Sequence, residues 1–339
     1  MTARFAPELP AAPASLHGPD GQPREGRFHG RCAQLDWSAL PAPLQKPRWW
    51  RQLHHKRWQY VGIACEDCFI ACAIVDVGWT NTAFAYLFDR ASGKVLGGLS
   101  RDGLPGLTAS VADLPAMGAA SRFGWLGAQL EFVEREPEVF SLHIKGPGGF
   151  RVDAVLDGRE SAPWLFAAGP VDGGVWHSTH KSPALQVSGL ALAGGKRYKL
   201  DGGSAALDHS NGLLPRETQW LWASAHAPGL GFNLQAGYFG NHENALWLDG
   251  NLIPLAAAHF SYNADQTLDE WRVRTEDGLL DLRFKPLGER REDRNLVVAA
   301  SRYVQPVGLY HGQVRVHADA PARLVEGLLG VAEQHFSRW

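Results

Sequence analysis

Residues 207–250 have the sequence LDHSNGLLPRETQWLWASAHAPGLGFNLQAGYFGNHENALWLDG, and this stretch indicates the fold class most clearly. Apolar and aromatic runs alternate with Gly- and Pro-containing turns, a pattern typical of short antiparallel strands. Successive side chains of a strand point to opposite faces, so Trp220, Trp222 and Ser224 would share one face of a strand at 218–225.

The same texture continues along the whole chain. Its 339 residues include 38 Gly and 21 Pro, and no short repeat of a propeller or solenoid is visible. The clearest signal of a half-buried strand is the alternation of Leu280, Leu282 and Phe284 with charged residues. The fold class is therefore all-β, with two antiparallel β-barrels or sandwiches. Strands are predicted at 58–65, 69–77, 82–88, 94–99, 128–134, 138–144, 151–156, 186–192, 204–209, 218–225, 230–236, 245–249, 271–275, 279–285, 295–303 and 309–317.

Chain length predicts two domains, because one hydrophobic core rarely serves more than about 250–300 residues. Residues 1–45 are rich in Pro and Ala and are expected to form an extended N-terminal arm. Residues 46–179 would form an N-terminal barrel, and residues 180–339 a C-terminal barrel that carries the candidate site. The segment 180–189 is expected to cross between the halves, and the closing segment 322–339 to form a strand and a helical turn.

Composition argues against several classes of partner. The net charge is -2, and no long run of one sign indicates a nucleic acid or an anionic membrane. No apolar segment approaches the roughly 20 residues that a transmembrane helix needs, and the start of the chain does not resemble a signal peptide. We therefore expect a cytoplasmic protein with no integral membrane segment, while its oligomeric state stays open.

Three of the four cysteines form a C-x2-C-x3-C pattern at Cys65, Cys68 and Cys72, which invites a metal-site interpretation. The flanking apolar runs instead favour a hairpin with Glu66 and Asp67 at its tip and with the cysteines as small buried residues. The sequence also contains no Gly-rich phosphate loop in a strand-to-helix context and no G-x-S-x-G motif. We predict neither a metal nor a cofactor.

The candidate catalytic residues are Asp208, His209 and Arg216. Asp208 and His209 are adjacent on a predicted strand, so only one of them would enter a given pocket. A carboxyl group beside apolar surface has a raised pKa and can act as an acid, which makes Asp208 the candidate proton donor and His209 or Arg216 its orienting partner. The alternative is a turn-forming Asp208, or a buried structural pair with Arg216 or His209.

The candidate binding residues surround this position in the sequence. Trp220 and Trp222 either line a ligand cavity or fill the core between packed sheets. Lys181 could bring a charge to the junction between barrels, although a solvated lysine is the commoner case. The other polar candidates are Asn233, Glu243 and Asn244, of which the last two could simply cap the strand ALWLDG, and Glu333, His335 and Trp339 are weaker candidates near the C-terminus.

The order of several segments resembles the family called Domain of Unknown Function 2804. These are HKSPALQVSG, LDHSNGLLPRETQWLWASA, GFNLQ, ENALWLDG, EWRVRTEDGLLDLRFKP and a closing G-x-x-E-x-H-x-x-x-W, and the likeness runs from about residue 28 to the end. A strand ending in Asp-His, followed by W-x-W and GFNLQ strands, distantly resembles the lipocalin-like carotenoid hydratases and tocopherol cyclases. That resemblance implies two lipocalin-like barrels side by side, a ligand near their interface, and cofactor-free protonation of an isoprenoid double bond by the acid at position 208.

Three functions are compatible with these observations. The first is a cofactor-independent acid/base enzyme, a hydratase, cyclase or isomerase, acting on a hydrophobic isoprenoid-like substrate. The second is a non-catalytic protein that binds a lipid or another hydrophobic small molecule. The third is carbohydrate binding or processing on tryptophan platforms, with Asp208 and Glu243 as the carboxylate pair.

Overall fold

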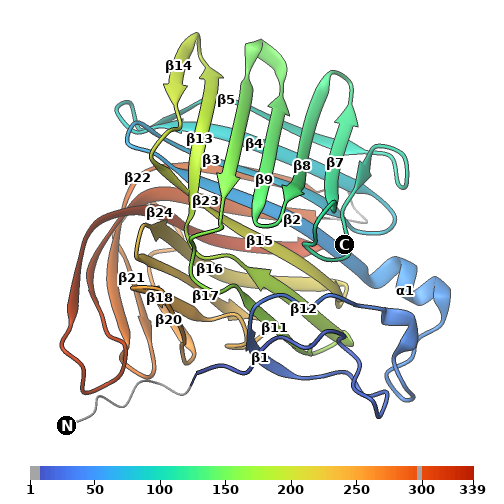
Figure 1. Cartoon of the computed structure of the whole chain (residues 1–339). Coiled ribbons are helices and arrows are strands. Elements are labelled where there is room, and N and C mark those ends of the chain that lie inside the picture. Colours follow the sequence, from blue (N-terminus) through green and yellow to red (C-terminus); the bar gives the residue numbers. More distant parts are fainter. Residues whose placement is uncertain (1–7, 296–299) are drawn as a thin grey trace.

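The computed structural model describes residues 8–295 and 300–339 and consists almost entirely of antiparallel strands in two curved sheets. The two sheets stack against each other, with β2 and β15 in the region where they meet (Figure 1). The predicted all-β fold of two lipocalin-like barrels is confirmed. The helical elements of the described residues are one short helix, α1 (Arg48–His54), and two 3-10 turns, η1 (Trp37–Ala39) and η2 (Pro147–Gly149).

The first sheet is built from the N-terminal part of the chain. Its main path runs in the order β5-β4-β3-β2-β15-β13-β10-β9-β8-β7-β6. The strands are β1 (Gly26–His29), β2 (His55–Ala64), β3 (Cys68–Asp76), β4 (Asn81–Asp89), β5 (Lys94–Gly103), β6 (Ala109–Ser110), β7 (Ala120–Trp125), β8 (Ala128–Glu136), β9 (Val139–Lys145), β10 (Arg151–Asp157), β11 (Leu165–Pro170), β12 (Trp176–Lys181), β13 (Leu185–Ala193), β14 (Lys196–Lys199) and β15 (Gly203–Leu213).

The second sheet follows from Glu217 onward, in the order β19-β18-β17-β16-β24-β23-β22-β21-β20. The strands are β16 (Glu217–Ala227), β17 (Leu230–Gly237), β18 (Ala245–Leu248), β19 (Asn251–Pro254), β20 (Ala258–Ser261), β21 (Trp271–Thr275), β22 (Leu280–Asn295), β23 (Ala300–Val314) and β24 (Arg323–Arg338). Leu280, Leu282 and Phe284 are buried as predicted.

Each barrel has its own hydrophobic core, and period-two alternation separates that core from the interface. Along β2 and β3, residues such as Val61, Ile63 and Ile70 pack inside the first barrel. Residues of the opposite face, including Tyr60 and Ala71, pack instead against residues of the second sheet. The outward faces of the first barrel are therefore apolar too, because they form the surface on which the second sheet lies.

The segment 180–189 does not cross between the halves, contrary to expectation. Lys181 ends β12 and Leu185 begins β13, and both strands belong to the first sheet. Pro183 interrupts the run between them, since it lacks the amide hydrogen of a sheet ladder. Within the described residues, the chain passes from the first sheet to the second between Leu213 and Glu217. The division into two domains at residues 179 and 180 stays a prediction.

The two ends of the chain also differ from the expected picture. Part of the N-terminal arm is a strand, because residues 26–29 pair with β11. Leu16 and Trp37 are buried against the first sheet, in one cluster with Phe166 and Trp176. At the other end, β24 continues to Arg338 without the expected helical turn. The strands predicted at 295–303 and 309–317 overlap one long strand, β23, and residues 296–299 lie outside the described part.

The cysteine-containing segment forms the expected turn. Cys65 and Cys68 flank a tight turn in which Glu66 and Asp67 are exposed, so the predicted hairpin is confirmed, and all four cysteines are buried thiols. Across residues 8–295 and 300–339, no helix is both long enough and apolar enough to cross a bilayer.

Candidate functional site

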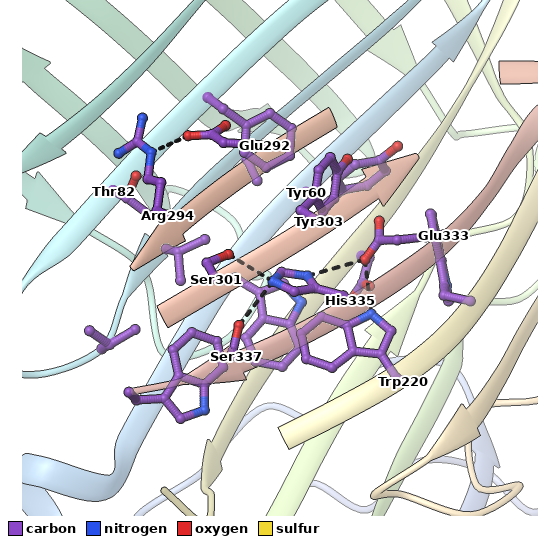
Figure 2. Close-up of a pocket in the computed structure, with 18 of the residues that line it drawn as sticks. Tyr60, Thr82, Trp220, Glu292, Arg294, Ser301, Tyr303, Glu333, His335 and Ser337 are labelled. Carbon is purple, nitrogen blue, oxygen red and sulfur yellow. Dashed lines mark hydrogen bonds and ion pairs between the residues drawn. The ribbon is translucent and has the colours of Figure 1, made fainter. Parts of the chain in front are cut away.

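A cavity of about 260 Å³ lies between the two sheets. Its walls combine strands β2–β5, β12 and β15 of the first sheet with β16, β17 and β22–β24 of the second, so neither barrel encloses it alone. Trp58 and Trp220 face each other across the interface with nearly parallel rings, 6.5 Å between centroids and 6° between planes. Trp222 packs edge-on against Tyr60, at 5.3 Å. Figure 2 shows part of the cavity lining, with side chains from both sheets.

A buried lysine held by two carboxyl groups forms one charged part of the cavity wall. The Lys181 Nζ lies 2.6 Å from Asp208 Oδ2 and 2.8 Å from Glu243 Oε2. The Lys181 and Glu243 side chains are 3% and 6% exposed, while Asp208 is 14% exposed. All three residues line the cavity.

Strand register explains why these residues meet. Lys181 on β12 is the direct cross-strand partner of Asp208 on β15, and opposite charges at such positions attract. Glu243 comes from the loop before β18, and its backbone carbonyl accepts a hydrogen bond of 2.9 Å from the Asn233 side chain. Ser210, two residues after Asp208 on the same face, donates to Asp208 Oδ1 at 3.1 Å.

Burial and neighbouring charges shift the pKa values of Lys181 and Glu243. Burial alone would lower the pKa of Lys181, but Asp208 and Glu243 outweigh it and raise that pKa. The amine therefore stays a cation and is not available as a nucleophile. Burial is the main cause that raises the pKa of Glu243, and the charge of Asp208 adds to it. Glu243 is thus a carboxyl group whose proton is held more tightly than usual.

The predicted tryptophans lie at the interface and each uses its indole N–H. Trp220 donates to Glu333 Oε1 at 2.9 Å, and Trp222 donates to Asn233 Oδ1 at 2.9 Å. Both rings line the cavity and also pack between the sheets. Asn244 is fully buried and accepts from the Gln235 backbone at 2.7 Å, which is a structural role.

His209 and Arg216, predicted as partners of Asp208, lie elsewhere. His209 points to the other side of β15, as strand alternation requires, and contacts Gln59 Oε1 and the Asp113 carbonyl, each at 3.2 Å. Arg216 follows β15 in the connection to β16 and lines a different small cavity. The charged partner of Asp208 is therefore Lys181, the residue for which solvent exposure was the default expectation.

The buried His209 makes stability depend on pH. Burial lowers its pKa to about 4, so between pH 6.5 and 4 the unfolded chain binds a proton that the native protein does not. Stability from this residue is present above pH 6.5 and is lost as the pH falls towards 4. Relative to wild type, His209→Gln should reduce the loss of unfolding free energy between pH 7 and 4.5 by about 2–3 kcal/mol. Urea titrations at both pH values measure it, and parallel losses in the two proteins would contradict the assignment.

A second polar cluster was only weakly indicated by the sequence. His335 Nε2 is 3.1 Å from Ser301 Oγ and 2.9 Å from Ser337 Oγ, and Nδ1 is 3.4 Å from Glu333 Oε1 (Figure 2). Glu333, His335 and Ser337 alternate along β24 and share one face. Reading residues 322–339 as a single strand would have placed them together. Trp58, which stacks beside the site, was missed because only its strand was predicted.

Fold and site together define a double-barrel β protein with an aromatic cavity at the junction of its barrels. The chain matches the family described as a domain of unknown function (DUF2804) over residues 8–339. It belongs to that family, which confirms the resemblance seen in the sequence. No curated protein matches the chain.

Solved structures share the architecture at low identity. An AttH-like protein of Nitrosomonas europaea is 16% identical with a TM-score of 0.54, over 84% of this chain and 93% of that one. CghA, solved with Sch210972, is 10% identical with a TM-score of 0.57, over 84% and 88%. Kievitone hydratase from Nectria haematococca is 11% identical with a TM-score of 0.47 over the same shares. At these identities the likeness concerns the fold.

Proposed function

We propose that this protein is a cofactor-independent acid/base enzyme that adds a proton to an apolar, isoprenoid-like substrate held between its barrels. The observation that carries the proposal is the Lys181–Asp208–Glu243 cluster, which opens on a cavity walled by tryptophans. A hydratase, a cyclase and an isomerase all begin with this step. The distant resemblance to lipocalin-like hydratases and cyclases supports the same chemistry.

The charges of Lys181, Asp208 and Glu243 indicate which group carries the proton that can be transferred. Net charge is costly at a poorly hydrated site, so one cation and two carboxyl groups are best accommodated as one ammonium, one carboxylate and one neutral carboxyl. The raised pKa of Glu243 fits the neutral member. Asp208, which accepts from Lys181 and Ser210, fits the carboxylate. The cluster thus holds one proton that can be given to a substrate and later recovered.

The cavity wall suits the intermediate that protonation creates. Transfer of the proton to one alkene carbon leaves a carbocation on the other, and aromatic faces stabilise such a cation by roughly 0.5–2 kcal/mol each. Trp58, Trp220 and Trp222 supply these faces. In hydration, a water molecule then bonds to the cationic carbon and loses a proton to the ionised carboxylate. In isomerisation or cyclisation, the intermediate itself returns a proton.

A carrier of hydrophobic molecules is the second candidate, and the same cavity favours it. CghA, which shares the fold, was solved with Sch210972, so a protein of this architecture can hold such a compound. Carbohydrate processing has less support. Glycosidase carboxyl groups flank the scissile bond, whereas Asp208 and Glu243 both bind one ammonium nitrogen, at 2.6 and 2.8 Å, with Lys181 between them.

Deuterium uptake distinguishes an enzyme from a carrier. The protein is incubated in D2O with the C15 compounds farnesene, farnesol and farnesal, and mass spectrometry follows incorporation on carbon. Tryptophan quenching measures binding in the same samples. An enzyme should label at least one compound above the protein-free blank. Binding without labelling would support the carrier function. If the compounds are neither bound nor labelled, both functions are excluded for this class of compound.

A further inference from the structure

Most polar groups in the cavity are satisfied by the protein itself. Trp220 donates to Glu333 and Trp222 donates to Asn233. Tyr86, on β4 close to the cavity, donates its hydroxyl to Gln305. Lys181 is paired with the carboxyl groups of Asp208 and Glu243, and the guanidinium groups of Arg290 and Arg294 pair with Glu292. These groups have little capacity left for a ligand.

The side chains of Tyr60, Tyr303 and Gln235 are exceptions, and the indole N–H of Trp339 is a further one. Among the described residues, nothing hydrogen-bonds to the hydroxyls of Tyr60 and Tyr303 or to either polar atom of the Gln235 amide. These side chains come from β2, β23 and β17, line the same cavity, and are only 9%, 5% and 2% exposed. Gln305 lies near enough to the Tyr60 hydroxyl to act on its pKa as a hydrogen-bond partner, but the contact does not have the distance and angle of a hydrogen bond. Gln305 already accepts from Tyr86 and donates to Glu333.

Buried polar groups of folded proteins are nearly always hydrogen-bonded, because leaving them unpaired destabilises the fold. Several such side chains around one cavity are therefore best explained by a ligand that pairs with them. Burial raises the pKa of both Tyr60 and Tyr303 well above 10, so both hydroxyls keep their protons and act as donors. Their natural partner is an acceptor oxygen, and Gln235 can meet a second oxygen function as donor or acceptor.

We propose that the ligand of this cavity is an uncharged apolar molecule that carries carbonyl oxygen, and not a plain hydrocarbon. Its carbonyl accepts from the tyrosine hydroxyls while its carbon framework lies against the tryptophans. An anionic ligand is disfavoured because Lys181, Arg290 and Arg294 are already ion-paired and Glu333 lies beside the tyrosines. This inference rests on the proposed function only in requiring that the cavity holds a hydrophobic guest.

The first test needs no ligand. In delipidated protein, Tyr60→Phe and Tyr303→Phe remove a hydroxyl that has no partner, so each should raise Tm by about 1–3 °C. Tyr86→Phe is the matched control, because it removes a hydroxyl that is bonded to Gln305 and should lower Tm. If the two cavity variants lower Tm as the control does, their hydroxyls are not orphaned and the proposal is overturned.

The second test compares three probes with one carbon skeleton: farnesal, farnesene and farnesoic acid. Tryptophan quenching in the Asp208→Asn variant gives binding without turnover, so failure of the catalytic proposal leaves this readout intact. Farnesal should bind about tenfold more tightly than farnesene, and Tyr60→Phe/Tyr303→Phe should abolish the difference. The proposal is overturned if farnesal binds no more tightly than farnesene or if neither compound binds. It is also overturned if farnesoic acid binds most tightly of the three.

Discussion

Asp208→Asn should lower the rate of deuterium uptake by about 10²–10⁴-fold while leaving binding of the same compound within a fewfold of wild type. The physical reason is the charge count of the cluster. With an amide at position 208, Lys181 and Glu243 form a neutral ion pair and no acidic proton remains to be transferred. The introduced amide can still accept from Lys181 through its carbonyl oxygen, so the fold should lose little stability.

The matched control for this variant is Asp265→Asn, which removes a carboxylate from an exposed turn and should leave the rate unchanged. Initial rates over a range of substrate concentrations separate kcat from KM, and the loss should fall on kcat. Retention of the wild-type rate in Asp208→Asn would end the proposal that this cluster supplies the proton.

Lys181→Met should destabilise the protein by about 3–5 kcal/mol, the largest stability effect expected in the site. The substitution leaves two carboxyl groups together in a poorly hydrated position without their cation. Adding Asp208→Asn to Lys181→Met removes one of them and should recover part of the loss. Unfolding free energies from urea titration at pH 7 measure both effects.

Lys285→Met provides the comparison for this series, because Lys285 lies on the exposed face of β22 and its removal should change stability by less than about 0.5 kcal/mol. A loss below about 1 kcal/mol for Lys181→Met would mean that the cluster is better hydrated than its burial indicates. Further destabilisation on adding Asp208→Asn would contradict the charge count itself.

The fold was largely predictable because alternation is a local property. The strand of Leu280, Leu282 and Phe284 and the hairpin at Glu66–Asp67 follow from period two and turn chemistry alone. The path of β12 was not predictable in this way. Residues 176–181 have the sequence WHSTHK, in which polar side chains occupy buried positions, and such a strand does not show the usual alternation.

The site was only half predictable for the same reason. Asp208, Trp220 and Trp222 stand out within one continuous segment, and alternation correctly separated Asp208 from His209. The ion pair with Lys181 depends on cross-strand register between β12 and β15, and Glu243 depends on a loop conformation. Neither is encoded by the spacing of residues along the chain, so the nearest cationic residue in sequence, Arg216, was the wrong partner.

The cavity lies at the interface between two barrels that each have their own core. The residues that stabilise the fold are therefore largely different from those that would contact a ligand. Side chains such as Ile63 and Phe284 pack in the core of their own barrel and do not line the cavity. Replacements of cavity-lining residues can therefore change the shape of the ligand space while both hydrophobic cores keep the protein folded. Members of the family could in this way diverge in what they accept without having to evolve a new scaffold each time.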